Sequence, residues 1–249
     1  MNVELIHNEE QLRRFHSLLA PLQDDEAYFL SMSVRKKYLT ADERLFYELR
    51  NAEMFARKLV KDSSFETFLR TVRSLEVSEG GYTTKNNLPM PEKAMVVYAQ
   101  INPVSGTHAL REFQNKATDL MFDLPTNPTA KKQLARLDTL LMNCYQRSHG
   151  TKTLLDIDVD TDNFYYVERL MNELKLRDVE FEIIATRSGF HVLMRRETVK
   201  FNYHKMVTEI DFEMEDNGDE GEVVVNKNYM VPLPGTYQAG TPVVMLEDL

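Results

Sequence analysis

Cysteine and tryptophan are nearly absent from this sequence, which has one cysteine, Cys144, and no tryptophan. A single cysteine excludes a disulfide framework and a cysteine-rich zinc site. It also fits the reducing interior of a cell. Residues 1–15 lack the basic and apolar regions of a secretory signal. We therefore expect a cytoplasmic protein.

Long apolar runs and an excess of basic residues are missing as well. No stretch approaches the ~18 consecutive apolar residues of a membrane helix, so we expect no membrane partner. The net charge is −9, whereas nonspecific nucleic-acid binders usually carry a basic excess. Any contact with nucleic acid must therefore use local basic patches, such as residues 35–37 or 131–132. Each patch alone is more simply a solvated surface, and residues 35–37 could instead meet acidic turns of the same chain.

The chain is long enough for one large domain or two small ones with a real core. It has 249 residues, of which 43% are hydrophobic and 28% charged, as is ordinary for a globular protein. In residues 1–90 apolar residues recur at helical spacing, and the pairs Thr40–Glu43 and Ser63–Glu66 have capping-box form. These patterns predict a mostly helical N-terminal portion that packs on the rest of the chain.

Residues 91–249 predict a core in which helices and strands alternate. Apolar periodicity and turn residues predict strands at 94–102, 151–160, 179–186, 190–196 and within 223–246, and helices at 108–121, ending near Cys144, at 163–174 and at 203–214. We therefore predict an α/β fold of the α+β type. The N-terminal portion and this core are expected to form one continuous globular unit.

Three aspartates at alternate positions are the first feature that carries chemistry. Asp156, Asp158 and Asp160 lie in "TLLDIDVDTDN", and on a strand their side chains would share one face. Neighbouring carboxylates repel and raise one another's pKa, and a divalent cation removes that cost. Mg²⁺ characteristically binds one or two carboxylates together with substrate phosphates. The spacing therefore predicts Asp156 and Asp158 as metal ligands.

The end of this motif permits other interpretations. Asp160 could be a third ligand, or Asp160, Thr161 and Asp162 could cap the helix that follows. The whole segment could also be an acidic turn that binds nothing. The apolar residues between the aspartates favour a position near the core for the first two.

A tight turn before a later strand is the second feature. In "ATRSGFHVLM", Ser188 and Gly189 form the turn and His191 lies near the start of the strand. Backbone N–H groups, a serine hydroxyl and a histidine at such a turn can contact phosphate oxygens. Alone, a histidine in a strand is more simply a core residue with satisfied hydrogen bonds.

The two features together resemble the archaeo-eukaryotic primase superfamily, which includes primases, primase-polymerases and the polymerase domains of bacterial end-joining ligases. "LLDIDVD" is similar to its first acidic motif, and "IIATRSGFHVLM" to its Ser…His motif on a later strand. "MVPLPGTYQAGTPVVML" resembles the Pro-rich segment after the third motif, and "VVYAQINPVSG" an Asn-Pro strand found upstream. The resemblance covers about residues 94–249.

The resemblance implies a primase-polymerase catalytic core with an RRM-like mixed or antiparallel sheet. Asp156 and Asp158 would hold Mg²⁺ or Mn²⁺, and Ser188 and His191 would contact the triphosphate. Arg187, Lys152 or Lys227 could assist with phosphate charge, and Arg187 is the candidate that lies beside the second motif. The implied activity is template-dependent nucleotidyl transfer, in which a 3′-hydroxyl attacks the α-phosphate and pyrophosphate leaves. Nucleoside triphosphates and a DNA or RNA template would be the partners, in replication or repair, together with other replication proteins. A phage or mobile-element source is one option, with the host cytoplasm or nucleoid as the location.

The sequence offers several candidates for the third acidic residue of the family pattern. Asp219 is the preferred candidate for catalysis and metal binding, Asp211 is an alternative, and the position could also be filled by Asn226 or Asn228. With an asparagine there, we expect impaired catalysis. The alternative function is then a primase-like accessory module that binds nucleotides or nucleic acid without polymerising them. A metal-dependent phosphohydrolase is a third interpretation.

Overall fold

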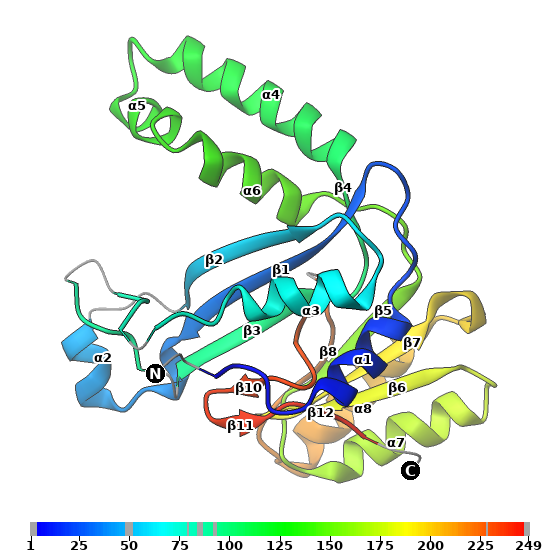
Figure 1. The fold of residues 1–249 in the computed structure, drawn as a ribbon. Helices are drawn as coiled ribbons and strands as arrows, with labels where there is room; N and C mark the ends of the chain where they lie inside the picture. The colour runs from blue at the N-terminus through cyan, green and yellow to red at the C-terminus, as the bar shows by residue number, and fades with distance from the viewer. Residues whose placement is uncertain are drawn as a thin grey trace.

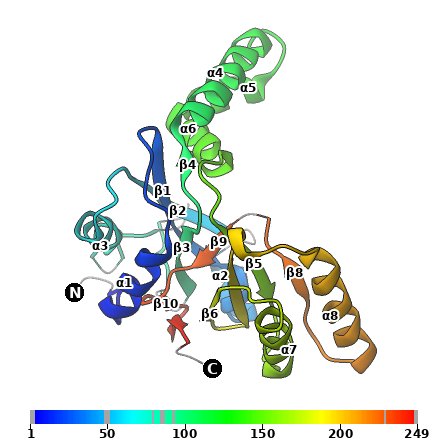
Figure 2. The ribbon, with the colours of Figure 1, turned by 90° about the vertical axis from the view of Figure 1, so that its right-hand side faces the viewer.

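The computed structural model describes residues 4–47, 52–78, 80–83, 87–91, 94–227 and 229–246, which form a mixed α+β fold with two antiparallel sheets (Figure 1). Figure 2 shows helices α1 and α3 on one side of the molecule and α7 and α8 on the other. None of the helices in this described part is both long and apolar enough to cross a membrane.

The first sheet combines strands from both ends of the chain. It contains β1 (Glu26–Arg35), β2 (Ala52–Val60), β3 (Met95–Gln100), β4 (Val104–Ser105), β9 (Met230–Pro232), β10 (Tyr237–Gln238) and β11 (Thr241–Pro242). The strand order is β11-β10-β3-β1-β2, while β4 pairs with β1 and β9 with β3. All these pairs are antiparallel. The Pro-rich C-terminal segment therefore completes a sheet that the N-terminal strands begin.

Two capped helices cover the first sheet. The side chain of Asn8 accepts hydrogen bonds at the start of α1 (Glu9–Leu18), and Ser64 does the same for α3 (Phe65–Arg73). Phe15 and Phe68 are fully buried in the core beneath these helices. A short helix, α2 (Ala41–Tyr47), and the 3₁₀ turn η1 (Lys36–Tyr38) follow β1.

A helical arm extends from the first sheet between β4 and β5 (Figures 1 and 2). It consists of α4 (Gly106–Asp123), α5 (Pro128–Leu134) and α6 (Leu137–Arg147). At its base, Cys144 and Ala109 pack against Phe29 of β1. Arg57 of β2 donates a 2.7 Å hydrogen bond to Oδ1 of Asn143, so the arm is attached to the sheet by both apolar and polar contacts.

The second sheet has the order β12-β6-β7-β5-β8. It contains β5 (Leu154–Val159), β6 (Phe181–Ala185), β7 (Phe190–Arg195), β8 (Val223–Val225) and β12 (Val244–Met245), with the helices α7 (Phe164–Lys175) and α8 (Tyr203–Asn217) and the 3₁₀ turn η3 (Arg196–Thr198) between them. Leu155, Ile157 and Val159 of β5 pack in one core with α7 and α8. The other face of β5 is therefore directed toward the first sheet.

Asn102 joins the two sheets at the start of β5. Its Oδ1 accepts hydrogen bonds from the backbone N–H groups of Thr153 (2.9 Å) and Leu154 (3.0 Å), and its Nδ2 donates to the carbonyl of Leu154 (2.9 Å). Asn102 is buried, so these bonds satisfy polar groups that water cannot reach. The Asn-Pro segment thus fixes the strand that carries the aspartates.

The prediction of a mostly helical N-terminal portion is wrong. Residues 4–78 contain α1, α2 and α3, but also β1 and β2, two long strands of the first sheet. β1 is buried along nearly its whole length, with helices on one face and the arm over part of the other. Its first half is continuously apolar from Ala27 to Leu30, so only the second half shows the alternation that predicts a strand. The loop expected at residues 123–132 contains most of the helix α5, and the helix expected to end near Cys144 is α6, which ends at Arg147. The helices and strands predicted between residues 151 and 214 lie where they were expected.

Candidate functional site

Asp156 and Asp158 lie on the face of β5 that points away from α7 and α8. Asp156 is fully buried, whereas the side chain of Asp158 is 40% exposed. In the register of β5 and β7, Asp158 lies directly opposite His191. The two carboxylates and the imidazole therefore form one group on neighbouring strands, as the alternation of the sequence predicts.

His191 bridges the two carboxylates. Its Nδ1 lies 3.0 Å from Oδ2 of Asp156, and its Nε2 lies 3.8 Å from Oδ1 of Asp158. Burial lowers the pKa of His191, but the neighbouring carboxylates, first Asp156, raise it to about 8. At neutral pH the ring is therefore a cation, and it compensates part of the negative charge at this position.

Asn226 occupies the third position beside this pair. Its Nδ2 donates a 2.6 Å hydrogen bond to Oδ2 of Asp156, and its backbone N–H donates to the carbonyl of the same residue (3.0 Å). Because Val224 lies opposite Asp158 in the sheet, the next residue on that face, Asn226, lies opposite Asp156. Continuing the alternation past β8 would have selected Asn226 from the sequence. Asn228 lies outside the described residues.

The preferred third acid, Asp219, does not join this group. Its Oδ2 accepts hydrogen bonds from the hydroxyl of Tyr166 (2.6 Å) and from Nδ2 of Asn163 (3.2 Å). Tyr166 lies in the core between the second sheet and its helices, so Asp219 is on the opposite side of the sheet from Asp156. Asp211 accepts a hydrogen bond from the backbone N–H of Val223 (2.7 Å) and supports the turn into β8.

A polar cavity of about 300 Å³ opens beside the carboxylates. Asp158, Asp160, Ser188, His191 and Asn226 line it, together with basic and aromatic residues of the first sheet and its η1 turn: Arg35, Lys37, Tyr38 and Tyr98. The cavity thus lies between the two sheets, where both contribute side chains. Acidic and basic groups face the same space, as binding of a metal–phosphate ligand requires.

Lys37 is a residue of the cavity that local sequence patterns did not assign to the site. Its Nζ donates a 3.1 Å hydrogen bond to Oγ of Ser188 and lies 3.9 Å from Oδ1 of Asp160. The basic patch at residues 35–37 therefore meets an acidic turn of the same chain, one of the two possibilities that the sequence left open. The sequence gives no local signal for this contact, because Lys37 lies in the η1 turn after a strand of the first sheet and Ser188 lies in the turn between two strands of the second.

The turn that carries Ser188 depends on Gly189. Its φ is +150°, and a Cβ at this position would lie 2.0 Å from the carbonyl oxygen of Val159. Only glycine permits the turn to cross the end of β5 this closely. Ser188 is thereby held beside the last aspartates of the motif.

Arg187 is directed away from the cavity toward the Pro-rich segment. Its backbone N–H donates to Oε1 of Gln238 (2.8 Å), its Nη1 donates to the carbonyl of Ala239 (2.7 Å), and its guanidinium lies 4.9 Å from the ring centre of Tyr38. These contacts fix the turn against the first sheet. They give Arg187 a positioning role in this structure.

The helix after the aspartate motif is capped by Asn163 and not by Asp160, Thr161 or Asp162. The side chain of Asn163 accepts the hydrogen bond from Tyr165 at the start of α7 (3.1 Å), and Thr161 Oγ1 accepts one from the N–H of Asn163 (3.2 Å). Asp160 lines the cavity, whereas Asp162 is exposed.

The oxygen donors at this position fit Mg²⁺ or Mn²⁺. Asp158, Asp156 and the amide oxygen of Asn226 supply the hard ligands that these ions prefer. Burial raises the pKa of Asp158, and Asp156 and Asp160 raise it further, so a nearby cation would favour its ionised form. In the described ranges, no three His, Cys, Asp or Glu side chains form a metal-binding group by themselves. A metal here would therefore need the asparagine or oxygen atoms of a substrate.

Comparisons with protein-family models, with curated proteins and with solved structures found no match. The resemblance to the primase superfamily therefore stays a prediction from the sequence motifs. The geometry of the cavity and its side chains is the basis on which function can be argued.

Proposed function

We propose that the protein is a template-dependent nucleotidyltransferase of the primase-polymerase type. The observation that carries the proposal is the grouping of Asp158 and His191 at one wall of a cavity whose other wall provides Lys37 and Arg35, with the buried Asp156 in contact with His191. Carboxylates can hold a divalent ion, and the cations can bind the phosphates of a nucleoside triphosphate. A DNA or RNA template and other replication proteins would be the remaining partners, within the cytoplasm.

The topology of the second sheet supports this proposal. Its elements follow the order β5-α7-β6-β7-α8-β8, with the strands arranged β6-β7-β5-β8. This is the β-α-β-β-α-β arrangement of ferredoxin-like units, to which the RRM-like sheet implied by the superfamily resemblance belongs. In this arrangement β5 and β7 are neighbours, so the two motifs of the sequence come together.

The proposed chemistry assigns a role to each side chain. Asp156 and Asp158, with Asn226, would hold Mg²⁺ or Mn²⁺, which would supply charge neutralisation at the phosphates and activation of the 3′-hydroxyl. His191, as a cation, orients Asp156 and offers its ring to a phosphate oxygen. Lys37 and the hydroxyl of Ser188 are placed to donate to the triphosphate, so the negative charge of pyrophosphate is stabilised as it leaves.

A second function is favoured by Asn226. An amide at the third position is neutral, and its Nδ2 already donates to Asp156. One negative charge fewer weakens binding of the second metal ion that polymerisation commonly uses. The alternative proposal is therefore a module that binds nucleotides or nucleic acid without joining them.

Primer extension and calorimetric titration, carried out side by side, separate these functions. We expect incorporation of nucleotides on a primed or unprimed template with Mg²⁺ or Mn²⁺, and loss of incorporation in Asp156→Ala/Asp158→Ala. Asp162→Ala is the matched control, because it removes a carboxylate of the same motif that is exposed and outside the cavity. Full incorporation by the double variant would overturn the proposal. Binding of nucleotide without extension would support the module, and nucleotide hydrolysis without extension would support a phosphohydrolase.

A further inference from the structure

Two further hollows continue from the acidic cavity onto the helical arm. A second cavity, of about 500 Å³, shares Arg35, Tyr98 and Met230 with the acidic cavity. A third hollow, a groove of about 890 Å³ on the arm, shares Asn143 and Arg147 with the second. The three hollows therefore adjoin one another in a row from the arm to the proposed site, and we call this row the channel.

The arm end of the channel is basic although the chain as a whole is acidic. The groove is lined by four cationic residues, Lys116, Lys132, Arg136 and Arg147, and the second cavity adds Arg35 and Lys227. His149 also lines the second cavity, but burial and the neighbouring Lys152 lower its pKa. No Asp or Glu is among the described residues that line these two hollows. Lys116 pairs with Glu112 on α4, but Lys132, Arg136 and Arg147 form no ion pair with any described residue. Such a concentration of positive charge, in a protein of net charge −9, favours a polyanionic ligand.

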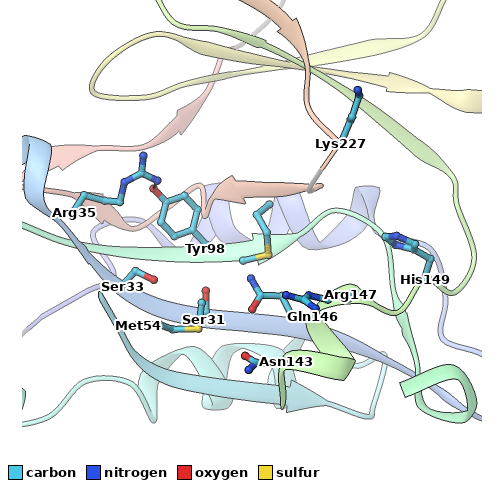
Figure 3. A pocket seen from close by; sticks show the side chains of 11 residues that line it. Ser31, Ser33, Arg35, Met54, Tyr98, Asn143, Gln146, Arg147, His149 and Lys227 are labelled. Atoms are coloured by element: carbon cyan, nitrogen blue, oxygen red, sulfur yellow. Dashed lines mark hydrogen bonds between the residues drawn. The ribbon is translucent and has the colours of Figure 1, made fainter. Parts of the chain in front are cut away.

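The second cavity contains a buried hydroxyl that nothing in the described structure satisfies. Ser31 of β1 is fully buried, and its Oγ has no hydrogen-bond partner. Figure 3 shows its side chain and that of Ser33 directed into the cavity, with Asn143 and Gln146 of α6 beside them. A buried polar group without a partner costs free energy, and a ligand with its own polar groups would remove that cost. The side-chain amides of Asn143 and Gln146 can form hydrogen bonds with donors and acceptors such as those at the edges of nucleobases.

We propose that a single nucleic-acid strand lies in the channel, with phosphates on Lys132, Arg136 and Arg147 of the arm and one nucleotide in the cavity above Ser31. The shared residues Arg35 and Tyr98 place that nucleotide next to the acidic cavity. The proposal therefore rests on the proposed function, because it takes the acidic cavity as the site toward which the strand runs. A volume of about 500 Å³ lies in the range of pockets that hold one small ligand, which suits one nucleotide of a single strand. The arm is then the part of the protein that holds the strand to be copied.

The direct test is fluorescence anisotropy of labelled single-stranded DNA and RNA oligonucleotides of about 15 nucleotides, a typical length for one binding module. The channel variant is Lys132→Ala/Arg136→Ala/Arg147→Ala. Because this variant removes three cations that would each bind a phosphate, we expect the Kd to rise about a hundredfold at about 0.1 M salt and the slope of log K against log salt to fall by about 2. Comparing the DNA and RNA oligonucleotides shows which sugar the channel prefers. Loss of affinity for either oligonucleotide in the channel variant supports the inference.

The matched control removes the same charge elsewhere. Lys61, Lys200 and Lys205 are exposed and line none of the three hollows, so Lys61→Ala/Lys200→Ala/Lys205→Ala should bind within about threefold of the unaltered protein, since only the general field changes. Equal weakening in both triple variants, or unchanged binding in the channel variant, would overturn the inference. All six side chains are exposed, and far-ultraviolet circular dichroism checks that both variants are folded.

Ser31→Ala tests whether the strand reaches the floor of the second cavity. Loss of one hydrogen bond to the ligand predicts about a threefold to tenfold weaker Kd without loss of folding stability. An unchanged Kd would show that the strand does not enter this cavity and would overturn that part of the inference.

Failure of this inference can be told apart from failure of the proposed function. If the channel variant binds oligonucleotides normally while Asp156→Ala/Asp158→Ala abolishes extension, the channel is wrong and the proposed function stands. If the channel variant loses the strand while the double aspartate variant still extends a primer, the channel stands and the assignment of the carboxylates fails.

Discussion

His191 and Asp156 form a buried ion pair in which Nδ1 of the imidazole lies 3.0 Å from Oδ2 of the carboxylate. The side chain of Asp156 is completely buried and that of His191 is 9% exposed, so water compensates neither charge. The pair links the two motifs that the sequence singles out, one on β5 and the other on β7. Its first consequence concerns stability.

Removing His191 should destabilise the fold strongly. His191→Leu leaves the carboxylate of Asp156 buried beside one neutral donor, and breaking a buried pair in this way costs about 3–5 kcal/mol of unfolding free energy. Urea unfolding at neutral pH measures the change. The double variant Asp156→Asn/His191→Leu removes the unpaired charge and should recover much of the loss, as a double-mutant cycle would show. A double variant as unstable as the sum of the single ones would contradict the coupling.

The parts of this site that sequence predicts are those fixed by local geometry. Asp156 and Asp158 share a face because a strand alternates, and His191 meets them because a strand–helix–strand–turn–strand pattern makes β5 and β7 neighbours. The position of Asp219 could not be predicted in this way. The chain reverses after α8, and the carboxylate of Asp219 accepts a hydrogen bond from Tyr166 on the helix side of the sheet.

The first sheet illustrates a second limit of sequence patterns. The first half of β1 is continuously apolar from Ala27 to Leu30, and only its second half alternates apolar with polar residues. β2 follows a capped helix closely enough that it can be taken for a continuation of that helix. The contact of Lys37 with Ser188 depends on how this sheet packs against the other one. No local rule contains that information, because the two residues are 151 positions apart.

Gly189→Ala should disturb the turn at the cavity. The added Cβ would clash with the carbonyl oxygen of Val159, and the backbone would keep a φ of +150° that alanine rarely adopts. We expect a loss of about 3 kcal/mol or more, together with weaker nucleotide binding. Gly218→Ala is the matched control, since its φ is +72° but no atom lies within 4 Å of the added Cβ. The control should cost only about 1 kcal/mol, and equal losses in thermal or urea unfolding would contradict the steric explanation.

Protonation of His16 should lower the stability of the protein as the pH falls below about 6.5. Burial among Tyr28, Phe65 and Phe68 lowers the pKa of His16 below its ordinary value of 6.5, and its Nε2 has no partner among the described residues. Because the unfolded chain binds the proton more readily, the stability contributed by neutral His16 is complete above pH 6.5 and is lost as pH falls through the lower folded pKa.

Thermal unfolding of the unaltered protein and of His16→Phe, each at about pH 7.5 and about pH 5.5, checks this sign. We expect the difference in Tm between the two pH values to shrink in the variant, because phenylalanine takes the place of the ring without a titrating group. The exposed residue His204 on α8 supplies the control His204→Phe, which should leave the difference unchanged. An identical pH dependence in all three proteins would show that His16 does not contribute.

Asn226→Asp should lower the stability of the metal-free protein and raise its affinity for a divalent metal. The new carboxylate would face Asp156 across β5 and β8, where the amide now donates a 2.6 Å hydrogen bond. Without a divalent ion, repulsion and the lost donor should lower the unfolding free energy by about 1–3 kcal/mol. With Mn²⁺, a third carboxylate completes an oxygen ligand set, and we expect about tenfold tighter binding, seen as a rise in Tm on metal titration.

The control for this substitution is Asn163→Asp, which adds the same charge at the cap of α7 beside Asp219, on the other side of the sheet. It should not alter Mn²⁺ binding. If the protein is a polymerase limited by its asparagine, Asn226→Asp should also raise the rate of primer extension. If it is a nucleotide-binding module, the metal should bind more tightly and no extension should follow. Unchanged Mn²⁺ affinity in Asn226→Asp would show that Asp156 and Asp158 do not form a metal site, because a carboxylate at this distance must act on any cation they hold.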